Sequence, residues 1–139
     1  MSDPFHLSRF VDAQAQTFEA ARAELAAGRK RGHWMWFVFP QIAGLGLSEM
    51  SQRFAISGRA EAEAYLAHPL LGPRLKNCAR LVNAAEGRSA HDIFGHPDDL
   101  KFQSSMTLFA AAAPHEAVFA EALRKYFGDE SDRATLDKL

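Results

Sequence analysis

Cysteine is nearly absent from this 139-residue sequence, which contains Cys78 alone. A single cysteine excludes an internal disulfide and is typical of a reducing compartment. No apolar run approaches the roughly 20 residues that a membrane-spanning helix requires. The first residues, MSDPFHLSRF, lack the basic region and apolar core of a signal peptide. We therefore expect a cytoplasmic protein.

An excess of charge of either sign is also missing. The formal net charge is −1, so no global field favours nucleic acid or an anionic membrane as a partner. Hydrophobic residues make up 47% of the sequence and charged residues 24%, proportions that are typical of a globular protein and exclude a disordered one. The length suits one domain, residues 1–139, with a sizeable core.

The sequence does contain many signals for helices. Apolar residues recur at helical spacing in residues 7–25 and 69–82, and these segments end at Gly28 and Gly87. The segment RAEAEAYLA favours a helix that must end before Pro69. Further helices are expected in residues 49–55, 89–95, 98–113, 115–128 and 132–139, with Ser48, Ser89 and Asp132 as N-caps. We predict an all-α fold, a single compact array of about seven to eight short helices.

Only the segment HWMWFVF could form a strand, because it is short and rich in aromatic and β-branched residues. A lone strand without a convincing partner makes a poor sheet. We therefore predict one or two buried helical turns at this place.

The stretch around this segment, GRKRGHWMWFVFPQIAGLGLS, is the first candidate site. Three consecutive cations lead directly into His33 and the two tryptophans, Trp34 and Trp36. A segment that is apolar on all sides is typically buried, and a buried indole needs a partner for its N–H group. Two interpretations remain open. Both tryptophans and His33 belong to the core, or one indole forms the wall of a pocket that His33 lines and that attracts an anion.

The cations of this stretch cannot all face the same way, so at most two can reach one ligand. Lys30 is closest in helical phase to His33 and Trp34. We predict that Lys30 points toward the pocket, that Arg29 or Arg31 stays in solvent, and that at least one of the two tryptophans is core structure.

Gln41 and a glycine loop end the stretch. Backbone N–H groups freed by Gly44 and Gly46 can bind a phosphate or carboxylate before the helix that Ser48 caps. The G-x-G-x-S pattern lacks the strand–turn–helix context of dinucleotide folds, and we predict no cofactor. Gln41 either ties the loop down or faces a ligand.

The second candidate site is the segment DDLKFQSSMTLFAAAA. On a helical wheel Asp98, Lys101 and Ser105 form a polar column, and Ser104 flanks Lys101. Beyond Ser105 the helix is almost wholly apolar, so the column should emerge at the rim of the core, where a cleft can form. We predict that the two candidate segments converge on one site.

Catalysis at such a site would depend on His33, Lys101 or Ser105. Lys101 and Ser105 have the i,i+4 spacing of a base and a nucleophile, but enzymes of this kind need a strained, desolvated setting that a sequence does not show. The alternative is a surface ion pair of Asp98 with Lys101, and serines bonded to backbone carbonyls. We predict no metal site, because the acids and histidines around His96 are typical of a helix start and no H-E-x-x-H or paired-cysteine spacing occurs.

Six segments together carry a family resemblance: LSRFVDAQ, ARAELAAGRKRGHWMWFVFPQIAGLGLSEMS, EAEAYLAHPLLGPRL, DIFG, DDLKFQSSMTLFA and FGDESDRATLDKL. They resemble the bacterial family known as domain of unknown function 1810, from about Leu7 to Leu139, and the G-R-K-x-x-H-W-M-W-x-x-F-P-Q pattern is highly specific. The resemblance implies an all-α helical array and supplies no catalytic residues. A calpastatin-like label given to some members does not suit this chain, because such inhibitors are disordered repeat proteins. The resembling segments include Arg9, Gln14, Lys30, His33, Trp34, Trp36, Gln41, Gly44, Lys101, Ser104, Ser105 and Thr107.

Two functions agree with these observations. The first is a pocket that binds, and in an enzyme would process, a small anionic ligand with a ring, such as a nucleotide or an ADP-ribose-like compound. Its expected contacts are Lys30, His33, Trp34, Trp36, Gln41, Lys101 and Ser104. The alternative is a protein-interaction module with aromatic and cationic anchors on an exposed face. A concave pocket touching both segments favours the first function, and a flat aromatic patch favours the second.

Overall fold

The computed structural model describes residues 2–139, which form ten α-helices and no strand. In chain order the helices are α1 (Ser8–Gln14), α2 (Phe18–Ala26), α3 (Met35–Val38), α4 (Glu49–Arg53), α5 (Arg59–Ala67), α6 (Leu71–Ala84), α7 (Ala90–Phe94), α8 (Asp98–Ala112), α9 (Ala117–Phe127) and α10 (Arg133–Asp137). The all-α prediction is confirmed. The count exceeds seven or eight because residues 7–25 form two helices, α1 and α2, and because the short turn α3 counts as a helix.

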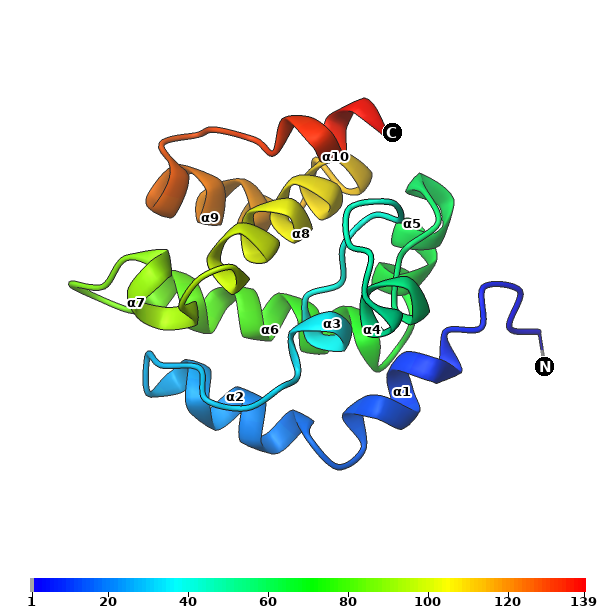
Figure 1. Ribbon diagram of the computed structural model, residues 1–139, viewed down its shortest axis with the longest axis horizontal. Coiled ribbons are helices and arrows are strands. Elements are labelled where there is room, and N and C mark those ends of the chain that lie inside the picture. Colours follow the sequence, from blue (N-terminus) through cyan, green and yellow to red (C-terminus); the bar gives the residue numbers. More distant parts are fainter. Residues whose placement is uncertain (1) are drawn as a thin grey trace.

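Helix α6 crosses the middle of the molecule, with α1 and α2 on one side of it and α8, α9 and α10 on the other (Figure 1). Helices α2, α5 and α9 pack directly on α6, and α8 packs on α5, α7, α9 and α10. The buried apolar side chains form one cluster, which includes Phe10, Trp34, Tyr65, Leu75 and Phe102. The residues that flank α3, among them Trp34, Phe39 and Ile42, are part of this single core.

Burial explains the two longest helices. On α6 the side chains of Leu71, Leu75, Cys78 and Val82 are buried at helical spacing, so one stripe of the helix faces the core. Burial also raises the pKa of the Cys78 thiol to about 12. In α8 every residue from 104 to 109 is buried, as the apolar composition of its second half predicts.

The N-caps expected from the sequence are present. The side chains of Ser48, Ser89 and Asp132 each accept a hydrogen bond from the backbone N–H three residues later. Helix α4 ends at Arg53, two residues earlier than predicted. The reason is tertiary, because the backbone of Ile56 turns away to form a parallel bridge with Ile42.

Arg9 joins α1 to the chain around α4 and α5. Its guanidinium donates to the Glu61 carboxylate at 2.8 Å and to four backbone carbonyl oxygens, those of Phe5, His6, Arg53 and Ala55. The Glu61 side chain is only 4% exposed, and its other oxygen accepts from the backbone and hydroxyl of Ser57. Arg9 is therefore a structural residue, which explains a cation at this position without a ligand.

Gln14 has a similar structural role inside the core. Its amide nitrogen donates to the backbone oxygen of Phe37 at 2.7 Å and to the Tyr65 hydroxyl, and its amide oxygen accepts from Arg74. These bonds fix the single turn of α3 against α1, α5 and α6. The segment HWMWFVF is thus a buried helical turn, as predicted, and not a strand.

Candidate ligand-binding site

The two segments singled out in the sequence meet at the carboxylate of Asp98, in the first turn of α8. One oxygen of Asp98 lies 2.9 Å from Lys30 Nζ, and the other lies 3.5 Å from Lys101 Nζ. Each ammonium group also lies over an indole ring, Lys30 over Trp34 at 5.2 Å and Lys101 over Trp36 at 5.4 Å. The predicted convergence is therefore confirmed by direct contacts.

Lys30 reaches Asp98 because the chain leaves α2 sharply at Gly28, whose φ of 78° lies in the left-handed region. The backbone N–H of Lys30 then donates to the carbonyl oxygen of Ile93 at 2.7 Å, which fixes the segment against α7. The Lys30 side chain is 9% exposed, whereas Arg29 and Arg31 are exposed. Lys30 is thus turned inward and Arg29 and Arg31 stay in solvent, as predicted, although Lys30 pairs with Asp98 rather than lining a pocket with His33. Residues 29–33 are not helical, so helical phase does not decide the directions of their side chains.

Trp34 belongs to the core. It is 2% exposed, and its indole N–H donates to Glu24 Oε1 at 2.9 Å. The same carboxylate oxygen accepts the backbone N–H groups of Arg31 and Gly32. Burial raises the pKa of Glu24, but these hydrogen bonds and the charge of Lys30 outweigh burial, so its pKa lies below the ordinary value of 4.5. Glu24 therefore holds the loop that carries Lys30.

The lowered pKa of Glu24 leads to a pH-dependent prediction. A carboxylate with a lowered folded pKa stabilises the fold above its ordinary pKa, and this stabilisation is lost as the pH falls through the folded value. We expect Glu24→Gln to lower the free energy of unfolding by about 1 kcal/mol at pH 7, because charged hydrogen bonds become neutral ones. Urea unfolding at pH 3 to 8 should show a constant difference from wild type above pH 6.

Below the ordinary pKa of 4.5 the same difference should shrink, since the wild-type carboxyl becomes protonated there. Glu19→Gln is a suitable control, because Glu19 lies on the same helix and forms only an exposed pair with Arg22. A difference for Glu24→Gln that stays constant down to pH 3 would contradict the role assigned to this carboxylate.

Trp36 differs from Trp34. Its side chain is half-buried, and among residues 2–139 its buried indole N–H finds no hydrogen-bond partner. A buried polar group without a partner costs free energy, so this N–H is a candidate contact for a bound molecule or an ordered water. One tryptophan is thus firmly in the core, while the other lies at its edge beneath Lys101.

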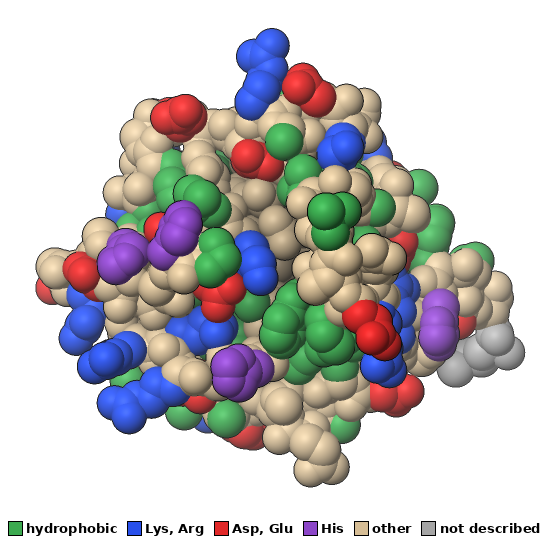
Figure 2. Space-filling model, viewed as in Figure 1, with side chains coloured by type: hydrophobic (Ala, Val, Ile, Leu, Met, Phe, Trp, Pro, Cys, Tyr) green, Lys and Arg blue, Asp and Glu red, His purple; other side chains and the backbone are tan. Residues whose placement is uncertain are grey.

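A pocket of about 220 Å³ lies next to Lys101, between the loop that follows α3 and the helices α8 and α10. Its lining residues are Gln41, Leu45, Gly46, Ser51, Pro97, Leu100, Lys101, Ser104, Asp132 and Ala134. Figure 2 shows the face on which these elements lie, with a hollow near its middle that basic and hydrophobic side chains border. Both candidate segments therefore contribute to one concave surface.

Gln41 has an amide group available at this pocket. Within residues 2–139 its side chain makes no hydrogen bond, and the loop is tied down instead by its backbone oxygen, which accepts from Ile56. The sequence left open whether Gln41 ties the loop down or faces a ligand. The backbone of Gln41, and not its side chain, ties the loop down. The side chain is left to face the pocket.

The opposite wall carries a carboxylate that sequence analysis assigned only to a helix cap. Asp132 Oδ2 accepts hydrogen bonds from the backbone and hydroxyl of Thr135 and from the Ser104 hydroxyl, the last at 3.0 Å. Ser104 therefore connects α8 to α10 as well as lining the pocket. Lys101 and Asp132 give the pocket one positive and one negative group, which suits a ligand that carries both an anion and N–H donors.

Five of the predicted site residues do not line this pocket: Lys30, His33, Trp34, Trp36 and Ser105. His33 is exposed and does not line this pocket. Ser105 is fully buried, and its hydroxyl has no hydrogen-bond partner in the described part of the chain. Of the three residues considered for catalysis, only Lys101 lines the pocket. In residues 2–139, moreover, no group of three or more His, Cys, Asp or Glu side chains is placed to hold a metal ion.

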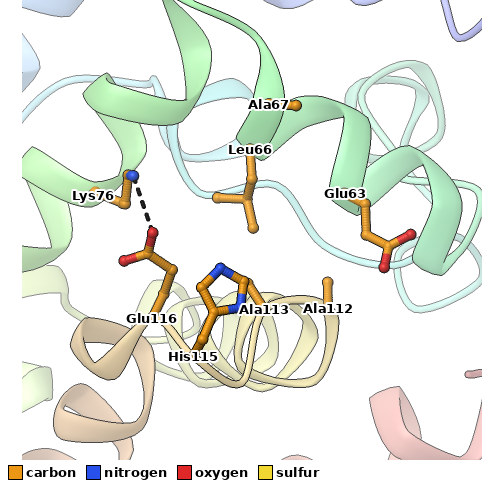
Figure 3. Close-up of a pocket in the computed structure, with 8 residues that line it drawn as sticks. All are labelled: Glu63, Leu66, Ala67, Lys76, Ala112, Ala113, His115 and Glu116. Atoms are coloured by element: carbon orange, nitrogen blue, oxygen red, sulfur yellow. Dashed lines mark hydrogen bonds and ion pairs between the residues drawn. The ribbon is translucent and has the colours of Figure 1, made fainter.

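A second pocket, of about 310 Å³, lies where α5 and α6 meet the connection from α8 to α9. Figure 3 shows Leu66 and His115 facing each other across it, with the Lys76–Glu116 ion pair at one end. Lys76 and Glu116 compensate each other at 3.2 Å, and much of the remaining wall is alanine. No residue of the two candidate segments contributes a charge to this pocket, so we place the candidate site at Lys101.

The fold and this site define a small all-α protein with a polar pocket at the edge of its core. A family model described as "Protein of unknown function (DUF1810)" matches residues 4–139, and the chain belongs to this family. The crystal structure of the conserved hypothetical protein Rv1873 from Mycobacterium tuberculosis at 1.38 Å is similar to this chain, with 57% sequence identity and a TM-score of 0.98. The match covers 99% of this chain and 98% of that chain. No curated protein is significantly similar.

No helix in residues 2–139 combines the length and the apolar character needed to cross a membrane.

Proposed function

We propose that this protein binds a small anionic metabolite with a nitrogen-containing ring in the pocket beside Lys101. One observation supports this proposal above all. Lys101 lines the pocket while Asp98 and Trp36 hold its ammonium group, and the unpaired amide of Gln41 lines the same pocket. A cation held in this way offers a fixed contact for the anionic group of a ligand.

The opposite wall of the pocket, where Asp132 lies, is suited to a ring that carries N–H donors. The carboxylate of Asp132 accepts such donors, and Gln41 can donate to or accept from the ring edge. Leu45, Pro97 and Leu100 add apolar surface for the ring faces. A nucleobase or a similar heterocycle with one acidic group combines these properties.

The size of the pocket limits the ligand. Pockets for drug-sized molecules have volumes of roughly 300–1,000 Å³, and this one has about 220 Å³. A mononucleotide or a smaller heterocyclic acid therefore suits it better than a whole ADP-ribose. Binding rather than catalysis is proposed, because the Ser104 hydroxyl is bonded to Leu100 and Asp132 and the lining residues include no histidine that could serve as a base.

The alternative, a protein-interaction module, required aromatic anchors on an exposed face. Trp34 is buried and Trp36 is half-buried beneath Lys101, so neither projects from the surface. The geometry thus favours the pocket.

Thermal unfolding of the wild type in the presence of mononucleotides and heterocyclic acids tests the proposal. A compound at 100 times its Kd adds about 2.7 kcal/mol to the free energy of unfolding and should raise Tm by several degrees. Lys101→Met keeps the stem over Trp36 but removes the charge, and should weaken binding of the active compound about tenfold. Gln41→Ala should weaken it several-fold at unchanged Tm of the free protein.

Arg124→Gln serves as the control, because Arg124 is an exposed cation on α9 that does not line the pocket. It should bind the compound as the wild type does. The proposal fails if no compound with both an acidic group and a ring shifts Tm, or if Lys101→Met and Gln41→Ala bind the active compound with wild-type affinity.

A further inference from the structure

The two arginines that flank Lys30 face a different hollow. Arg29 and Arg31 line a cavity of about 450 Å³ together with Arg88, which precedes α7, and with Glu24 and two alanines of the α2 end. Figure 2 shows Lys and Arg side chains gathered at the lower left of the molecule, where Figure 1 places the end of α2 beside α7. Arg88 lies more than fifty positions from the other two in the chain, so folding is what brings the three together.

None of these three arginines is used to hold the fold. Within residues 2–139 their guanidinium groups form no ion pair and donate no hydrogen bond, whereas Arg9, Arg22, Arg59 and Arg74 all do. Arg88 lies close to the end of α2. Its side chain packs against the bare backbone of Gly28, where an added Cβ would lie 3.1 Å from Arg88 Cδ and Nε. The cavity is therefore lined by three guanidinium groups, none of which has an acceptor within residues 2–139.

The nearby carboxylates do not neutralise this cluster by pairing. Glu24, in the cavity wall, already accepts three N–H donors with one oxygen. Asp92 is occupied by the backbone N–H of Ser89 in the capping box of α7. Bringing like charges together without partners is unfavourable, and an anion in the cavity would relieve this repulsion.

We propose that Arg29, Arg31 and Arg88 form a second binding site, which takes the phosphate groups of a small phosphorylated compound. A guanidinium presents paired N–H donors that match two phosphate oxygens, and several such groups around one cavity suit a diphosphate. The chain as a whole carries a formal charge of −1, which disfavours a long polyanion such as RNA. This site shares no residue with the pocket beside Lys101, so its failure would leave the proposed function untouched.

Isothermal titration of the full chain with inorganic pyrophosphate tests this site. The wild type should bind, and Arg88→Gln should weaken binding about tenfold, a loss of about 1.4 kcal/mol. The double variant Arg29→Gln/Arg31→Gln should weaken it further. Arg88→Lys keeps the charge but loses the paired donors, so it should lie between the wild type and Arg88→Gln.

Arg124→Gln removes a cation outside the cavity and should stay within about twofold of the wild type, at a salt concentration of about 0.15 M that screens distant charges. Circular dichroism and Tm should match the wild type for all variants, because the substituted side chains are exposed. The proposal is overturned if pyrophosphate does not bind, or if Arg124→Gln weakens binding as much as Arg88→Gln does. A single-stranded RNA that binds more than tenfold more tightly than pyrophosphate would overturn the assignment to a small compound.

Discussion

Replacing Arg9 by alanine is expected to lower the free energy of unfolding by about 3–5 kcal/mol, a large part of the stability of an ordinary domain. The substitution removes five hydrogen bonds that join α1 to the chain around α4 and α5. It also leaves the carboxylate of Glu61, whose side chain is 4% exposed, without its positive partner. Urea unfolding followed by circular dichroism measures this loss directly.

A double-mutant cycle separates two contributions to this loss of stability: the lost contacts of Arg9 and the cost of leaving the Glu61 carboxylate buried without a partner. Glu61→Gln alone should also be destabilising, because it removes the charge that Arg9 faces. The double variant Arg9→Ala/Glu61→Gln should be less unstable than the two separate losses added together, since neither charge is then left alone. Purely additive losses would show that Arg9 and Glu61 are not coupled, and would contradict the stabilising ion pair assigned to them.

Trp34→Ala should likewise cost about 3–5 kcal/mol. The ring is 2% exposed and packs against Phe39 and beneath Lys30, so its removal leaves a cavity in the core. The substitution also removes the indole donor from Glu24, which holds the loop before α3. Both effects act on the same element, and thermal and urea unfolding should agree on a strongly destabilised but folded protein.

Trp36→Ala provides the comparison. This ring is half-buried and its N–H has no partner in the described residues, so the loss of stability should be smaller, about 1–2 kcal/mol. Equal losses for Trp34→Ala and Trp36→Ala would contradict the assignment of one ring to the core and the other to its edge. A Trp34→Ala protein with the same Tm as the wild type would contradict the assignment of Trp34 to the core more strongly.

Local signals made much of the fold predictable. Ser48, Ser89 and Asp132 cap helices because their side chains bond to backbone three residues away, and proline and glycine end helices through their own dihedral angles. The early end of α4 was not predictable, because it depends on Ile42 and Ile56 pairing across a loop. Sequence patterns describe neighbours along the chain, and a partner fourteen positions away leaves no periodic signal.

The candidate site was also predictable only in part, because some of its residues carry a local signal and others come together only through tertiary contacts. An unusual mixture of cations and aromatic residues indicated Lys30 and Trp36, and a polar column on an otherwise apolar helix indicated Lys101. Asp132 was missed as a pocket residue, because a helix cap explains an aspartate fully and its approach to Ser104 is a tertiary contact. Ser105 was wrongly expected at the site. Helical phase places Ser105 beside Lys101, but it does not show how deeply the helix is buried at that turn.

The single thiol, Cys78 on the buried face of α6, can report how often the folded protein opens around this helix. Cys78 is fully buried and burial raises its pKa to about 12, so the thiol stays protonated at pH 8 while the fold is intact. A thiol reagent can therefore modify only those molecules in which α6 has separated from its neighbours. When closing is faster than modification, the labelling rate measures the population of this open form. The stabilities of the Arg9 and Trp34 variants can thus be compared under native conditions, without denaturant and without an introduced cysteine.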